Sequence, residues 1–108
     1  MTLDDYQRLA ERTLSGDLPE RDRLLMTALG LIGEAAECSE QIKKHVFHGH
    51  ELDPALLRKE LGDVLWYLAT LASTAGLSLS EIAAGNLEKL RQRYPQGFSA
   101  EASRNRTE

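Results

Sequence analysis

The sequence is poor in several features that define protein classes. It has one cysteine, Cys38, in 108 residues, which excludes an internal disulfide and fits a reducing cytosol. It has no signal-peptide pattern and no apolar run long enough to cross a bilayer. We therefore expect a cytoplasmic protein without a membrane partner. Cys38 itself falls near the apolar side of a predicted helix, which favours a buried structural thiol over a nucleophile.

An excess of positive charge is also lacking. The formal net charge is −4, from 17 acidic residues against 13 lysines and arginines. This balance argues against a nucleic-acid-binding domain, which normally carries a one-sided basic patch. The chain also lacks a glycine-rich Walker loop, which excludes a P-loop enzyme. At this length and with 42% hydrophobic residues, the sequence predicts one ordinary globular domain.

No segment shows the pattern of a strand, so the sequence predicts an all-α fold. Asp53 followed by Pro54 is typical of a helix start, and Ser78 with Glu81 forms a capping box. We expect a four-helix bundle in a single domain over residues 1–98 and a polar, flexible tail over 99–108. The predicted helices span about 3–14, 21–47, 54–75 and 79–94.

Two acidic pairs, Glu34 with Glu37 and Glu60 with Asp63, are the most informative feature that is present. Residues three apart share one face of a helix, so each pair can direct its oxygens to one place. Both pairs lie in or beside the apolar side of their helices, where carboxylates are costly to bury. On the third helix this apolar side comprises Leu57, Leu61, Val64 and Leu68.

Four carboxylates in one place would repel one another without a cation. Mg²⁺ is a hard cation that prefers oxygen ligands and keeps sites for water or substrate phosphate. The acidic pairs therefore predict a Mg²⁺ site, which Mn²⁺ could also occupy, with Glu34, Glu37, Glu60 and Asp63 as ligands. The other 13 acidic residues balance the 13 basic residues.

Three polar residues, Asn86, Lys89 and Arg93, follow one face of the fourth predicted helix. An amide, an ammonium and a guanidinium on one face suit the oxygens of a phosphate group. The alternative is that the two cations extend from an apolar surface to solvent and that the amide is buried and hydrogen-bonded. With the acidic pairs, the functional interpretation describes a site for a metal-bound polyphosphate.

Two further features have competing interpretations. His45, His48 and His50 could form a transition-metal cluster, but histidines at the end of a helix also suit its dipole, and we prefer that explanation. Trp66 lies about 160° from Leu68 around the third helix, almost opposite the predicted core. Either the first helix covers this side chain, or a second subunit does, and we expect the second.

The chain resembles the MazG superfamily of all-α nucleoside triphosphate pyrophosphohydrolases over about residues 25–98. The acidic pairs, their order along the chain and the Asn-x-x-Lys-x-x-x-Arg segment behind them make the resemblance specific. The matching segments are Gly33-Glu34-Ala35-Ala36-Glu37, Lys43-Lys44, Phe47-His48-Gly49, Lys59-Glu60-Leu61-Gly62-Asp63-Val64-Leu65-Trp66-Tyr67-Leu68 and residues 86–98.

The resemblance implies Mg²⁺-dependent cleavage of a nucleoside triphosphate, in either the ribo or the deoxy form, to the monophosphate and pyrophosphate. It makes the four acidic residues metal ligands, and makes Asn86, Lys89 and Arg93 substrate contacts. Water is the expected nucleophile, with Glu37 as the favoured proton acceptor. The resemblance also implies a homodimer or a dimer of dimers, and a role in house-cleaning or in nucleotide-pool control.

Two alternatives remain open at this stage. A phosphoribosyl-ATP pyrophosphohydrolase would share the helical architecture and the same bond cleavage. A catalytically silent helical module with an interaction or regulatory role would share only the fold. The intact acidic pairs and phosphate contacts favour an enzyme over the second alternative.

Overall fold

A computed structural model of the protein describes residues 1–106, and the prediction of an all-α fold is confirmed. Residues 107 and 108, the end of the predicted tail, lie outside the described part. Within residues 1–106, five helices follow one another where we expected four. They are α1 (Leu3–Glu11), α2 (Glu20–His48), α3 (Pro54–Thr74), α4 (Leu79–Arg93) and α5 (Ala100–Arg104).

The helix ends follow the capping signals in the sequence. The side chain of Asp53 accepts hydrogen bonds from the first turn of α3, and Ser78 caps α4 in the same way. Gly49 closes α2 with a φ of 73°, which favours glycine. The fifth helix lies in the tail that we expected to be irregular, where Ser99 caps its first turn.

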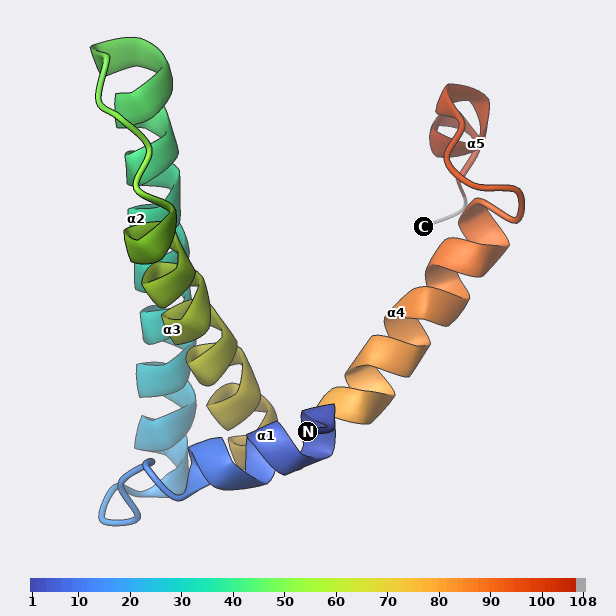
Figure 1. The fold of residues 1–108 in the computed structure, drawn as a ribbon. Coiled ribbons are helices and arrows are strands. Elements are labelled where there is room, and N and C mark those ends of the chain that lie inside the picture. Colours follow the sequence, from blue (N-terminus) through green and yellow to red (C-terminus); the bar gives the residue numbers. More distant parts are fainter. Residues whose placement is uncertain (107–108) are drawn as a thin grey trace.

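The helices form two arms joined at an elbow (Figure 1). The first, which we call the α2–α3 arm, consists of residues 20–74, and its two long helices pack side by side. The second, the α4–α5 arm, consists of residues 79–106 and extends away from the first. Helix α1 lies across the base, where it packs against α3 and against the start of α4.

Hydrogen bonds from α1 hold the elbow between α3 and α4. The amide nitrogen of Gln7 donates to the hydroxyl of Ser73 (3.0 Å) and to the carbonyl of Leu77 (2.9 Å). The amide oxygen of Gln7 accepts from the backbone N–H of Leu79 (2.8 Å). Asp4 adds hydrogen bonds to the first residues of α4. These bonds fix the direction in which α4 leaves the base, because they satisfy polar groups on both sides of the bend.

A small apolar core lies where α1, α3 and α4 meet. It contains Ala10, Ala69, Ala72 and Leu79, with Tyr6 and Trp66 packed against it. The indole N–H of Trp66 also donates to the hydroxyl of Thr13 at 2.7 Å. Helix α1 and the turn after it therefore cover part of Trp66 within the chain, and the side chain stays half-buried.

The predicted core face of α3 is also largely exposed. Leu61 is 53% exposed and Leu68 is 37% exposed, whereas the buried positions of this helix are Ala69, Thr70 and Ala72. Small residues let helices approach more closely than leucine does, and α3 packs on α1 with Ala69 and Ala72. On this face Leu57 and Val64 are half-buried, whereas Leu61 and Leu68 are left exposed in the single chain.

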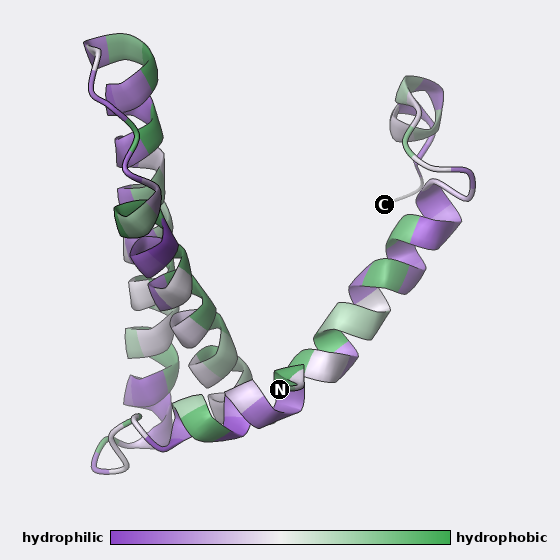
Figure 2. Cartoon of the chain, viewed as in Figure 1, coloured by the Kyte–Doolittle hydropathy of each residue, from purple (hydrophilic) through white to green (hydrophobic). Residues whose placement is uncertain are grey.

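Close packing also joins α2 to α3. A Cβ atom added to Gly30 would lie 2.1 Å from the ring of Tyr67, so only glycine fits there. Many other large apolar side chains are exposed on both arms. Figure 2 shows where hydrophobic residues lie along the two arms. Helices in the described part of the chain do not combine the length and apolarity that a membrane span requires.

Candidate functional site

The α2–α3 arm brings three of the four predicted acidic residues together. Glu34 and Glu37 lie on α2, Glu60 lies on α3, and one oxygen of each lies within 4.8 Å of the others. Within residues 1–106 this is the one group of three or more acidic, histidine or cysteine side chains close enough to share an ion. Asp63, one turn further along α3, is not a member of this group, although its charge acts on Glu37 and Glu60.

The carboxylates in this group disturb one another. A hydrogen bond with Glu60 raises the pKa of Glu37, and the negative charge of Glu60 adds to the effect. The pKa of Glu60 is raised by its hydrogen bond with Glu34 and by burial, against an opposing contribution from Glu37. A carboxyl pair hydrogen-bonds best when it holds a proton, so the site resists full ionisation without a cation.

This group fits a hard divalent cation. All its donors are carboxylate oxygens, which Mg²⁺ and Mn²⁺ prefer. Glu34 and Glu60 are half-buried, whereas Glu37 is exposed and leaves one side open. The Oε2 atom of Glu34 is buried and has no hydrogen-bond partner among the described residues. A buried carboxylate oxygen without a partner is costly, and a bound cation would remove that cost.

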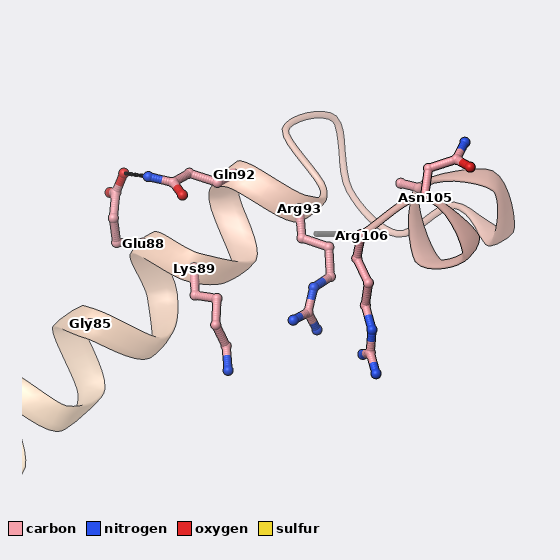
Figure 3. Close-up of a pocket in the computed structure, with 8 residues that line it drawn as sticks. Gly85, Glu88, Lys89, Gln92, Arg93, Asn105 and Arg106 are labelled. Carbon is pink, nitrogen blue, oxygen red and sulfur yellow. Dashed lines mark hydrogen bonds between the residues drawn. The ribbon is translucent and has the colours of Figure 1, made fainter. Parts of the chain in front are cut away.

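The predicted phosphate contacts lie on the other arm. Lys89 and Arg93 line a cavity of about 640 Å³ between α4 and α5, and their side chains extend in the same direction (Figure 3). Asn86 is exposed and does not line this cavity. Since the two arms diverge, a single chain does not bring these cations to the acidic group (Figure 1).

One residue of this cavity was missed by the sequence reasoning. Arg106 lines it together with Lys89 and Arg93, although it lies in the segment that we expected to be irregular. No periodic pattern could have placed it, because α5 is short and the turn before it sets its direction. A cationic residue in a polar tail does not by itself indicate a binding site.

The other candidates do not form a second site. The ring nitrogen Nδ1 of His45 lies 2.8 Å from the carbonyl of His50, which is a local contact at the end of α2. The rings of His48 and His50 are 6.3 Å apart. Burial, followed by the charges of the nearby carboxylates, raises the pKa of the Cys38 thiol. A raised thiol pKa opposes a role as nucleophile at neutral pH.

Comparisons with known proteins identify the family of the chain. The MazG nucleotide pyrophosphohydrolase domain matches residues 23–98, which contain the acidic group and the three predicted phosphate contacts. No solved structure matches the chain.

Relatives cover nearly all of the chain. It is 33% identical to Gene 37 protein of Mycobacterium phage L5 over 117 residues, which is 98% of this chain and 100% of the relative. It is 34% identical to dCTP pyrophosphatase 1 of Mus musculus over 105 residues, covering 91% of this chain and 62% of the mouse protein. For dCTP pyrophosphatase 1 of Homo sapiens the identity is 32% over 114 residues, covering 99% of this chain and 67% of the human protein. The chain therefore belongs to the MazG family and is a nucleoside triphosphate pyrophosphohydrolase.

Proposed function

We propose that the protein is a Mg²⁺-dependent enzyme that cleaves nucleoside triphosphates, or their deoxy forms, between the α and β phosphates. Its products are a nucleoside monophosphate and pyrophosphate. The observation that carries this proposal is the convergence of Glu34, Glu37 and Glu60 from two helices within the segment that matches the family. Asp63 remains a predicted fourth ligand, one turn from Glu60.

Different residues of the α2–α3 arm would bind the cation and accept the proton. A bound divalent cation would lower the pKa of a water molecule and offset charge on the phosphates. Glu34 and Glu60, which are half-buried, would hold the cation. Glu37 is exposed and has a raised pKa, so it has both the room and the basicity to accept the proton of the attacking water.

A second copy of the chain would complete the site. Lys89 and Arg93 lie on the arm that diverges from the acidic group, and Gln7 holds the elbow that sets this direction. Leu61 and Leu68 are exposed on the side of α3 that carries Glu60, and a partner surface would cover them. We infer a homodimer, or a dimer of dimers, in which the α4 helix of one copy approaches the acidic group of the other. The cations would then stabilise the charge that develops on the leaving pyrophosphate.

The substrate is a nucleotide whose base the site geometry does not specify. Two of the relatives are named dCTP pyrophosphatase 1, so dCTP is the first candidate. The enzyme would then act in nucleotide-pool control. Phosphoribosyl-ATP, the substrate of the alternative enzyme class, belongs in the same test because its cleavage needs the same chemistry.

Product analysis tests this proposal directly. The purified chain is incubated with Mg²⁺ and with dCTP, the other common triphosphates or phosphoribosyl-ATP, and the products are separated by anion-exchange chromatography. We expect the monophosphate and intact pyrophosphate, and no product when a chelator replaces Mg²⁺. A nucleoside diphosphate and orthophosphate as first products would contradict the mechanism. Failure to cleave any of these substrates would favour a silent helical module.

A further inference from the structure

The cavity on the α4–α5 arm has the size and the charge of an anion-binding site. Its volume of about 640 Å³ lies within the range of small-molecule sites, roughly 300–1,000 Å³. Three cations line it, of which Lys89 and Arg93 come from α4 and Arg106 comes from beyond α5. Their side chains extend to the same side in Figure 3, so one small anion could contact all three.

Among the described lining residues, the one with a carboxylate is Glu88, and its side chain is directed elsewhere. Glu88 forms an ion pair with Arg91 and accepts a hydrogen bond from Gln92 at 3.3 Å. In Figure 3 the side chains of Glu88 and Gln92 extend away from the three cations. The carboxylate of Glu88 is therefore not directed at the three cations.

The segment between the two helices places Arg106 beside α4. Gly97 has a φ of 90°, which favours glycine, and its N–H donates to the carbonyl of Tyr94 at 3.0 Å. The rings of Tyr94 and Phe98 are in contact, with centroids 5.2 Å apart. This turn reverses the chain, so the end of α5 lies next to the last turns of α4 (Figures 1 and 3).

We propose that Arg106 is a third phosphate contact of the nucleotide site, and that it binds the pyrophosphate part of the substrate together with Lys89 and Arg93. Guanidinium groups form paired hydrogen bonds with phosphate oxygens, and two of the three cations are arginines. A small polyphosphate suits the cavity better than a nucleic-acid polymer does, because the chain carries a net charge of −4. The assignment of the anion to the substrate rests on the proposed function.

Binding of inorganic pyrophosphate tests this assignment without catalysis. Isothermal titration calorimetry of the full chain at fixed ionic strength would compare the wild type with Arg106→Gln and Arg104→Gln. Arg104 lies on α5 and does not line the cavity, so its variant removes the same charge from the same segment. We expect Arg106→Gln to weaken binding roughly five- to tenfold, as for the loss of one exposed charge-assisted contact, and Arg104→Gln to change it less than about twofold.

Steady-state kinetics with the preferred triphosphate provide the second measurement. Arg106→Gln should raise KM and leave kcat nearly unchanged, because the contact forms in both the bound substrate and the transition state. Equal effects of the two variants, or no effect of Arg106→Gln, would overturn the assignment while leaving nucleotide cleavage intact. If the wild type cleaves no nucleotide but binds pyrophosphate through Arg106, the anion site stands and the proposed function fails.

Discussion

The two arms of the molecule differ in how tightly their helices pack. In the α2–α3 arm, fully buried Thr27 and Thr70 bond to their own helices, and Gly30 lets the two helices touch. This close contact is what brings acidic groups from both helices to one point. The α4–α5 arm buries little beyond Leu79 at its base. Packing thus positions the acidic group within one chain, whereas the elbow sets the direction of the helix that carries Lys89 and Arg93.

Removing single carboxylates from the α2–α3 arm should have the largest effect. We expect Glu37→Gln, Glu60→Gln and Asp63→Asn each to lower pyrophosphate release at least about 100-fold, the upper end of the effect of altering groups that support a metal. Circular dichroism should show an unchanged helix content. Calorimetry with Mn²⁺ should show that metal binding is lost in parallel. Near-complete activity in two of the three variants would remove the acidic group from the mechanism.

Changes on the α4–α5 arm should weaken substrate binding. A second copy of the chain with an intact α4–α5 arm should restore activity. Lys89→Ala with Arg93→Ala should raise KM strongly while leaving Mn²⁺ binding intact, because the acidic group lies on the other arm. Mixing this double variant with Glu60→Gln should restore about a quarter of the wild-type activity, since half of the dimers are mixed and each has one intact site.

The controls for this experiment are the two parent variants, each assayed alone at the same total concentration. Both should stay inactive under the conditions in which the mixture is active. If no activity returns although subunits exchange freely, both halves of the site must come from one chain. The arms would then have to close on each other within that chain.

The sequence was sufficient to predict α1 to α4 and three members of the acidic group, because capping residues and three-residue spacing act locally. Glu34, Glu37 and Glu60 could be placed on helix faces from periodicity alone. The choice of core face could not be made in this way. On α3 the small residues were buried and Leu61 was exposed, because packing distance decided the outcome over side-chain hydrophobicity. The direction of α4 was also unpredictable, since it depends on hydrogen bonds between residues more than 60 positions apart, such as Gln7 and Ser73.

The exposed leucines of α3 offer a test of assembly. Leu68→Lys would place a charge in the proposed subunit contact, so we expect the oligomer to dissociate at concentrations where the wild type is assembled. Ala55→Lys is the control, because Ala55 is exposed on the same helix and about 140° away from Leu68. Light scattering gives the mass directly. A wild-type mass near 12.0 kDa at micromolar concentration would show a monomer and contradict the proposed assembly.

The contact between α2 and α3 should be sensitive to a single methyl group. Gly30→Ala would place a Cβ 2.1 Å from the ring of Tyr67, so the ring or the helix must move. We expect a loss of about 1–3 kcal/mol in the free energy of unfolding, typical of overpacking. Gly33→Ala, on the same helix with nothing within 4 Å, should stabilise by up to about 1 kcal/mol through helix propensity. Urea unfolding curves of both variants measure these changes in the free energy of unfolding. Equal changes in the two variants would show that the contact between α2 and α3 tolerates a side chain at position 30.

The smallest expected effect concerns the metal-free acidic group. Interactions within this group raise the pKa values of Glu37 and Glu60, so the folded state holds their protons more tightly than the unfolded chain does. This contribution to stability is present at low pH and is lost as the pH rises above about 4.3 and through the raised values. In excess chelator, Glu60→Gln should therefore melt slightly above the wild type at pH 8, where repulsion is greatest, and the difference should shrink toward pH 5. Added Mg²⁺ should reverse the order at pH 8 by stabilising only the wild type. Scanning calorimetry at the two pH values, with and without Mg²⁺, measures each of these differences. A variant that melts below the wild type in chelator at pH 8 would show that these carboxylates do not strain the metal-free fold.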